Sequence, residues 1–491
     1  MLYVSMCKLY FEISIIANFL LHLPEDKSIM HFIDVLKKTK IQRQCTWGTD
    51  STFCVLWSLN GEKARVFACL LGQSRHCIPA MAALCTLHKE AARDLMRRIG
   101  VVMKSFRLTE EEMAYLADRY PTPFMVVSLD RVEQNYRYLC EKLPQVKIFY
   151  AIKANSEPAI LQRMAALGSN FDVASIGEIR LLASLGVPGS RMIYANPVKP
   201  AWDIAEAAKM GVNRFTFDDE SEIEKMAAAA PGAHVLVRVQ VKNDAAVVNL
   251  NEKFGVLPER ALALLHSARE AGLVPAGICF HVGSQSLRSD AYGSALNLCR
   301  RLFDEAQSQG MSLRVLDIGG GLPIPEIGQL DLDLEAMTAD IRQHLDRLFP
   351  DVEVWSEPGR YMCGTAVNLV TRVIGTKERN GQPWYVLDDG MYGSYNGLVF
   401  DHWTYKLEFC RDGKKTPSVF VGPSCDSIDV VARDYPAPLL QVGDLVLSPE
   451  MGAYSSSAAT GFNGFQPAKT IVYEDNMAVA DVACQNANMM V

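Results

Sequence analysis

A lysine ends the short apolar run in KIFYAIKANSEP, residues 147–158, at the point where a buried strand would stop. Removing an ammonium group from water is unfavourable, so Lys153 needs a partner or a chemical use in that place. One such use is a Schiff base with a carbonyl compound. Taken alone, Lys153 is more often a strand-end residue whose stem covers apolar surface.

Other residues able to do chemistry also lie within or directly after strand-like runs. They are Asp172 in FDVAS, Arg238 in HVLVRVQV, His281 in GICFHV, Gly319 at the end of RVLDIG with Gly320 and Gly321 after it, and Glu357, Pro358, Gly359 and Arg360 in EPGR. Each of these residues, taken alone, also has an ordinary structural explanation, such as a core histidine with its hydrogen bonds made or a glycine in a turn. Their joint position at strand ends makes those readings improbable together.

Eight β-rich runs alternate with Ala/Leu-rich amphipathic segments, which is the pattern of successive βα units. The runs are 147–152, 171–175, 191–196, 214–218, 234–241, 277–282, 314–319 and 353–357. This predicts an α/β fold, a (β/α)₈ barrel of the TIM type. Such barrels carry their sites at the carboxyl ends of the strands, which is where the residues above converge.

The segments flanking the barrel have a different character. After residue 360 the helical pattern fades into short β runs separated by Gly and Pro turns, and FMVVSL (124–129) could join the same sheet. We therefore predict a barrel over 126–359 and a C-terminal all-β domain, sandwich-like or barrel-like, formed by 103–125 and 360–491. Residues 1–102 show no sustained period, and we expect Met103 to be the natural start and residues 1–102 to be an extension.

Composition narrows the class of protein. The 491 residues are 49% hydrophobic and 21% charged, with a formal net charge of -7, which disfavours nucleic-acid binding. The thirteen cysteines show no zinc-type spacing, so reduced thiols and no metal site are expected. The run FEISIIANFLLHLP contains an acidic residue and is too short to span a membrane, so we expect no membrane association and a cytoplasmic location.

The glycine turn and EPGR together predict a phosphate site, since backbone N–H groups and a guanidinium are phosphate donors and barrels commonly hold phosphate there. A phosphate site beside a Schiff-base lysine, a histidine and a carboxylate suits pyridoxal 5'-phosphate, whose pyridine nitrogen needs an acidic partner. Glu357 can be that partner. We therefore predict this cofactor.

Seven motifs carry a resemblance to a known family: FYAIKAN, FDVAS, FHVGSQ, DIGGGLP, EPGRY, GPSCDSID and GAYSS, in this order. The chain from about residue 103 to 491 resembles the group IV, fold-type III pyridoxal-phosphate decarboxylases, and within them the ornithine decarboxylases of the compact bacterial type. Together the seven ordered motifs are highly specific.

The resemblance implies a role for each residue. Lys153 would bind the cofactor covalently, His281 would stack on its ring, Glu357 would pair with the pyridine nitrogen, and Asp172 and Arg238 would support them. The phosphate would be held by Ser284, Gly319, Gly320, Gly321, Pro358, Gly359, Arg360 and Tyr454. Cys425 would protonate the α-carbon from the neighbouring subunit of a homodimer with shared sites.

The implied reaction is decarboxylation of L-ornithine to putrescine and CO₂ in polyamine biosynthesis. Asp401, with Phe400 before it, and Asp426 would face the distal amine of a diamino acid. L-Lysine, one methylene longer, is hard to exclude, since one CH₂ gives only about 1 to 3 kcal/mol of discrimination. The alternatives are a diaminopimelate decarboxylase, another enzyme of this cofactor class such as a racemase, and a non-catalytic regulatory relative.

Overall fold

The computed structural model describes residues 105–241, 252–288, 290–324, 333–401 and 403–473, and the backbone of four short strands outside these ranges. Its contacts divide the chain into the units Met1–Met103 and Lys104–Val491. In the first unit, β1 (Gln44–Trp47) pairs with β2 (Phe53–Leu56) in antiparallel fashion. The rest of the prediction for residues 1–102 lies outside the described residues.

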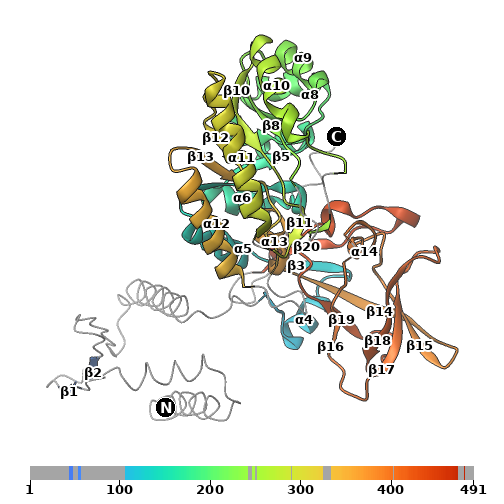
Figure 1. The fold of residues 1–491 in the computed structure, drawn as a ribbon. Coiled ribbons are helices and arrows are strands. Elements are labelled where there is room, and N and C mark those ends of the chain that lie inside the picture. Colours follow the sequence, from blue (N-terminus) through green and yellow to red (C-terminus); the bar gives the residue numbers. More distant parts are fainter. Residues whose placement is uncertain are drawn as a thin grey trace. The chain divides into compact units, whose positions relative to one another are not determined.

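Eight parallel strands of the second unit close into a barrel, as predicted (Figure 1). They are β4 (Val146–Ala151), β5 (Asn170–Val173), β6 (Met192–Tyr194), β7 (Arg214–Phe217), β8 (His234–Arg238), β10 (Val274–Cys279), β12 (Val315–Asp317) and β13 (Glu353–Ser356). Each barrel strand pairs with the next barrel strand along the chain, and the last, β13, pairs with the first, β4, to close the ring. All eight predicted strands are confirmed, and each ends one to three residues earlier than predicted.

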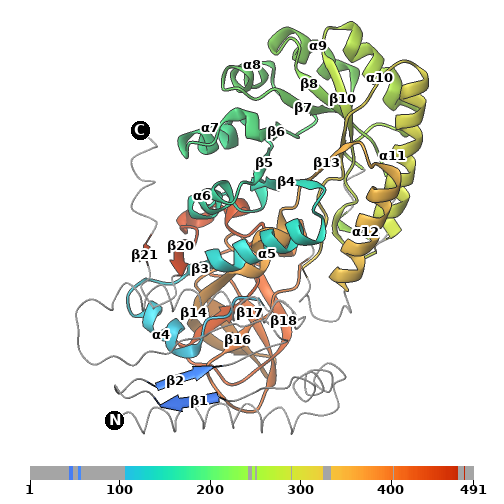
Figure 2. The same cartoon turned by 90° about the vertical axis from the view of Figure 1, so that its left-hand side faces the viewer.

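Helices follow the strands and lie outside the barrel (Figures 1 and 2). They are α5 (Leu129–Lys142), α6 (Pro158–Ala166), α7 (Ile176–Ser184), α8 (Ala201–Lys209), α9 (Glu220–Ala229), α10 (Pro258–Glu270), α11 (Asp290–Ser308) and α12 (Leu334–Leu348). Alternation along β4 shows how the layers form. Ile148 and Tyr150 join the large core cluster, while Phe149 on the other face belongs to a separate cluster and packs on Trp355, with ring centroids 4.8 Å apart.

The β domain is a nine-stranded mixed sheet. Its strands are β3 (Phe124–Ser128), β14 (Val367–Arg379), β15 (Gln382–Leu387), β16 (Glu408–Phe409), β17 (Thr416–Val421), β18 (Val430–Ala437), β19 (Leu445–Ser448), β20 (Lys469–Tyr473) and β21 (Ala480–Asp481). β3 lies between β14 and β20, so the run FMVVSL does join this sheet. The boundary predicted at residue 126 falls inside β3, and all of β3 belongs to the sheet of the β domain.

Short elements complete the second unit. α4 (Glu110–Ala117) starts at a capping box in which Thr109 and Glu112 exchange hydrogen bonds. The others are η1 (Ile152–Ala154), η2 (Gly189–Arg191), η3 (Gly364–Ala366), η4 (Ser456–Ala458), η5 (Phe462–Gly464), α13 (Arg360–Cys363), α14 (Gly397–Phe400), β9 (Ala246–Val248) and β11 (Ser284–Ser286). Within the described residues, every helix is too short or too polar to cross a bilayer, and no cluster of three or more His, Cys, Asp or Glu residues could bind a metal ion.

Candidate active site at the barrel mouth

Lys153 lies in η1, directly after strand β4, at the carboxyl end of the barrel. Its Nζ donates a hydrogen bond to Asp172 Oδ2 at 2.7 Å, and Asp172 is buried on the neighbouring strand β5. Partial burial opposes the charge on Lys153, but the negative charges of Asp172 and Glu357 raise its pKa above the ordinary value. The lysine is therefore a charged ammonium group held by a buried carboxylate.

Two more carboxyl groups, Asp317 at the end of β12 and Glu357 directly after β13, face this ion pair. Burial, followed by the charges of Asp317 and Asp172, raises the pKa of Glu357 well above its ordinary value. Burial also raises the pKa of Asp317 to about 6, although hydrogen bonds from the Gly319 N–H and from Glu357 oppose that shift. Glu357 thus carries a proton while Asp317 carries the negative charge.

His281 follows strand β10 and contributes a neutral imidazole. Burial, followed by the positive charges of Arg238 and Lys153, lowers the pKa of His281 well below its ordinary value. Its Nδ1 accepts a hydrogen bond from the Gly283 N–H at 2.9 Å, which leaves the ring proton on Nε2. Arg238, at the end of β8, packs its guanidinium over the ring of Phe254 at 4.9 Å.

The three glycines after β12 fit where no side chain could. Gly319 and Gly321 have φ angles of +67° and +106°. A Cβ at Gly319 would lie 2.2 Å from Phe280 O, and one at Gly320 would lie 2.5 Å from Glu357 O. The turn is therefore pressed against the ends of β10 and β13, and Ser286 of β11 reaches it through a 2.9 Å bond from its N–H to Gly321 O. Ser284 lies half-buried on the same short strand.

Arg360 is buried at the start of α13. It forms an ion pair with Asp401, and its guanidinium lies 4.4 Å from the ring centre of Trp403 and 4.9 Å from that of Tyr454. Arg360 and Asp401 were predicted to serve different groups, and their direct contact is a finding of the structure. Phe400, the residue before Asp401, is 62% exposed at the end of α14.

A loop of the β domain holds the turn that carries the lysine. The Tyr454 N–H donates to Ala154 O at 2.8 Å, and Asn155 Nδ2 donates to Gly452 O at 2.9 Å. Tyr454 adopts a φ of +59°, an uncommon conformation for tyrosine. On the other side of the turn, the Ala151 N–H donates to Pro358 O at 3.3 Å. Lys153 is thus fixed between the EPGR segment and the β domain.

Cys425 and Asp426 belong to a second cluster, on the loop between β17 and β18. The Cys425 side chain is exposed, and the Cys425 N–H donates to Asn463 Oδ1 at 3.0 Å. Asp426 Oδ2 accepts a 2.5 Å hydrogen bond from the Tyr392 hydroxyl, and this bond lowers the pKa of Asp426. Tyr392 stacks on Phe462 with ring centroids 4.2 Å apart.

Comparisons with known proteins agree with this geometry. Residues 129–364 match the family described as "Pyridoxal-dependent decarboxylase, pyridoxal binding domain". A lysine/ornithine decarboxylase of Selenomonas ruminantium is 60% identical over 373 residues, which cover 76% of this chain and 95% of the relative. The chain belongs to the pyridoxal-dependent decarboxylases. It is a pyridoxal-phosphate-dependent amino-acid decarboxylase of the ornithine/lysine type.

Solved structures of this decarboxylase family have the same fold. A lysine decarboxylase from Selenomonas ruminantium superposes with a TM-score of 0.74 at 59% identity, covering 76% of this chain and 98% of the other. A lysine/ornithine decarboxylase from Vibrio vulnificus, solved with cadaverine, gives a TM-score of 0.71 at 38% identity, covering 75% and 100%. The predicted family, fold and cofactor are confirmed by these comparisons.

The residues at the mouth fit the cofactor of the decarboxylase family. Asp172 Oδ1 and Arg360 Nε are buried without a hydrogen-bond partner, so an acceptor and a donor remain available there. The glycine turn forms a cradle that any Cβ would fill. A cationic donor, a close-packed glycine turn and a protonated carboxyl match a phosphate at one end and a pyridine nitrogen at the other.

Two residues near Lys153 were missed by the sequence analysis. Asp317 stands in DIGGGLP at the end of β12, so the strand-end rule that selected the glycines could have selected it too. Glu178 of α7 has a pKa raised to about 7, chiefly by burial and with the charge of Asp172 adding to the shift. It accepts a 2.6 Å bond from the Ala174 N–H, and its position in a helix gave no signal.

Proposed function

We propose that this decarboxylase converts L-ornithine to putrescine and CO₂ and also accepts L-lysine, which gives cadaverine. The observation that carries the proposal is the Lys153–Asp172 ion pair at the mouth of the barrel, beside the buried carboxyl of Glu357, whose pKa is raised well above its ordinary value by burial. The relative with 60% identity is named for both amino acids, and the Vibrio structure holds cadaverine. Putrescine formation would place the chain in polyamine biosynthesis, and we propose a cytoplasmic enzyme.

The proposed cofactor contacts follow from the positions of the side chains. Lys153 would bind the aldehyde carbon, Glu357 the pyridine nitrogen, and His281 one face of the ring, with Asp172 and Arg238 behind them. The phosphate would be held by Ser284, Gly319, Gly320, Gly321, Pro358, Gly359, Arg360 and Tyr454. When bound, pyridoxal phosphate supplies an electron sink for the bond that breaks at the α-carbon.

The protein's own groups prepare that chemistry. Glu357 holds a proton that it can share with the pyridine nitrogen, because burial and then the negative charge of Asp317 oppose its ionisation. His281 is neutral and places no positive charge against the ring. Asp172 keeps the Lys153 ammonium in place, so the lysine stays at the mouth when a substrate amine displaces it.

We propose that the distal amine of the substrate binds between Asp401 and Asp426, since two carboxylates suit one ammonium group. In the single chain, Asp401 pairs with Arg360 and Asp426 with Tyr392. Cys425 would return a proton to the α-carbon from the exposed loop of a second subunit. We therefore propose a homodimer in which each active site contains residues of both subunits.

Product identification tests the proposal. The full chain, loaded with pyridoxal phosphate, is given equimolar L-ornithine, L-lysine and meso-diaminopimelate, and the products are identified by mass spectrometry. Putrescine as the main product with some cadaverine supports the proposal. Lysine released from diaminopimelate would refute the substrate assignment, and the absence of any amine from a cofactor-loaded dimer would point to a regulatory protein.

A further inference from the structure

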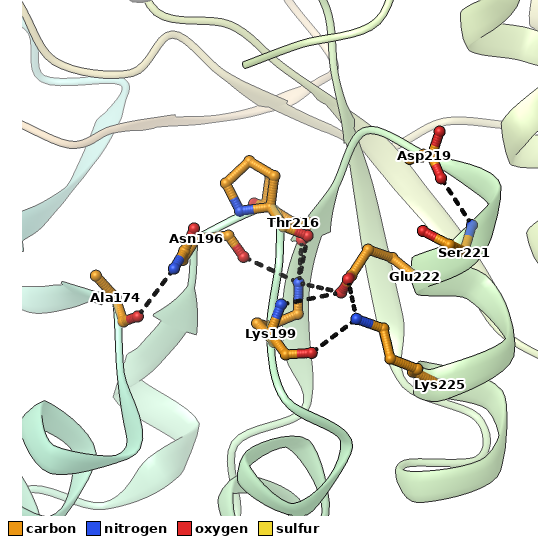
Figure 3. Close-up of polar contacts among 9 residues, drawn as sticks. Ala174, Asn196, Lys199, Thr216, Asp219, Ser221, Glu222 and Lys225 are labelled. Atoms are coloured by element: carbon orange, nitrogen blue, oxygen red, sulfur yellow. Dashed lines mark hydrogen bonds and ion pairs between the residues drawn. The ribbon is translucent and has the colours of Figure 1, made fainter. Parts of the chain in front are cut away.

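A second lysine near the barrel mouth is completely buried. Lys199 lies on the loop between β6 and α8, and its side chain has no exposed surface. Its Nζ donates to three backbone carbonyls, Asn196 O at 2.9 Å, Pro197 O at 3.0 Å and Thr216 O at 2.6 Å, as Figure 3 shows. A lysine is almost never fully buried without such partners, so this site is a specific feature of the fold.

Glu222 of α9 balances the charge of Lys199. This buried carboxylate forms a 3.4 Å ion pair with the Lys199 ammonium through Oε2 and pairs with Lys225 through Oε1 (Figure 3). Lys225 also donates to Lys199 O at 2.8 Å. Thr216 is part of β7, so the Lys199 ammonium ties the loop after β6 to the next strand and to the helix that follows it.

This loop in turn holds the end of strand β5. Asn196, whose carbonyl binds Lys199, donates from Nδ2 to Ala174 O at 3.3 Å (Figure 3). The neighbouring Ala195 N–H donates to Val173 O at 3.0 Å. Asp172, the partner of Lys153, is the residue directly before Val173. A continuous path of hydrogen bonds therefore leads from Lys199 to the strand segment that carries Asp172.

We infer that Lys199 is a positioning residue for the cofactor-binding lysine: through Asn196 and the end of β5 it keeps Asp172 aligned with Lys153. This inference rests on the proposed role of Lys153. Without the Lys199 ammonium, three carbonyls would lose their common donor, and the loop carrying Asn196 would loosen. The ion pair between Lys153 and Asp172 would then weaken.

The sign of the effect separates positioning from simple electrostatics. A weaker ion pair lowers the pKa of Lys153, so its unprotonated and reactive fraction at neutral pH rises. Removing a positive charge at Lys199 would, by Coulomb's law alone, raise the pKa of Lys153 and lower that fraction. Positioning therefore predicts faster acylation of Lys153 in Lys199→Met, and electrostatics predicts slower acylation.

The experiment uses the full chain freed of cofactor, treated at pH 7 with trace acetic anhydride and analysed by peptide mass spectrometry. The exposed Lys209 is the internal reference in each digest. In Lys199→Met we expect Lys153 to be labelled about tenfold faster relative to Lys209, which corresponds to a shift of about one pKa unit. An unchanged or slower rate would overturn the inference.

Two further measurements keep the test decisive. Pyridoxine 5'-phosphate lacks the aldehyde, and its affinity should stay within about twofold of wild type, since the phosphate cradle lies at β12 and β13 on the other side of β4. If the affinity for pyridoxine 5'-phosphate falls about tenfold, as much as the labelling rate changes, the variant has general damage to the site and a specific role of Lys199 is refuted. Asn196→Ala removes the hydrogen bond from Asn196 to Ala174 O without removing a buried charge. It therefore replaces Lys199→Met if that variant does not fold. Unchanged labelling of Lys153 in Asn196→Ala would overturn the inferred path from Lys199 to Asp172.

Failure of the proposed function gives a different result. Borohydride reduction of the wild-type holoenzyme, followed by peptide mapping, locates the cofactor-bound lysine. If the cofactor maps to a residue other than Lys153, the proposed site assignment fails whatever the labelling shows. If it maps to Lys153 and the variants label like wild type, only the role of Lys199 is refuted.

Discussion

Asp317 should reduce the stability of the cofactor-free protein at neutral pH, and asparagine in its place should relieve that penalty. The pKa of Asp317 is raised from 3.8 to about 6, mainly by burial. A difference of about two units, at about 1.4 kcal/mol per unit, gives roughly 3 kcal/mol. Because the folded pKa is the higher one, the contribution to stability is complete below pH 3.8 and is lost as the pH rises to about 6.

Asp317→Asn keeps an oxygen for the Gly319 N–H and has no proton to lose. The free energy of unfolding of the variant, minus that of wild type, should therefore rise by up to about 3 kcal/mol between pH 4 and 7 and stay level above that. Urea unfolding of both cofactor-free proteins, at one protein concentration and several pH values, measures the difference.

The exposed Asp412 offers a matched control. Asp412→Asn removes the same charge in contact with water, so its effect on the unfolding free energy should stay within about 0.5 kcal/mol. If the Asp317→Asn difference does not change with pH, or falls as the pH rises, the assignment of the negative charge to Asp317 and of the proton to Glu357 is wrong.

Three other predictions concern the cofactor and the substrate. Gly319→Ala places a Cβ only 2.2 Å from Phe280 O, so fluorescence titration should show cofactor affinity at least roughly tenfold weaker, whereas normal affinity would contradict the cradle. Asp401→Asn should raise the KM for L-ornithine roughly tenfold or more through the loss of a charge-assisted bond, and steady-state kinetics with an unchanged KM would remove Asp401 from the pocket. Inactive Lys153→Ala and Cys425→Ala subunits should regain part of the wild-type rate when mixed, as measured by CO₂ release; no recovery despite proven subunit exchange would argue against shared sites.

The barrel could be predicted because its strands and helices repeat with clear periods and turn signals. Residues at strand ends could be placed at one mouth by topology alone, and for this reason Lys153, Asp172, His281 and Glu357 are found together. The predicted boundary at residue 126 falls inside β3, since β3 pairs with strands more than 200 positions later and nothing local marks the sheet it joins.

Side-chain partners across long separations could not be predicted. Arg360 and Asp401 are 41 positions apart, and two opposite charges in a sequence do not show which acceptor each donor will meet. In the sequence, Lys199 resembles any exposed lysine before a helix. In the structure, three carbonyls and a carboxylate surround its ammonium group. Such burial depends on the three-dimensional course of neighbouring loops, which spacing alone does not reveal.

The hydrogen bond from Asn155 to Gly452 has a consequence for the synthesis of the chain on the ribosome. The two residues are 297 positions apart, so the turn that carries Lys153 lacks this support until the ribosome has made the chain as far as Gly452. At synthesis rates of about 5 to 20 residues per second, that interval lasts about 15 to 60 s. A nascent barrel would spend this time without its finished lysine turn, so stable capture of the cofactor is expected only after Gly452 has been made.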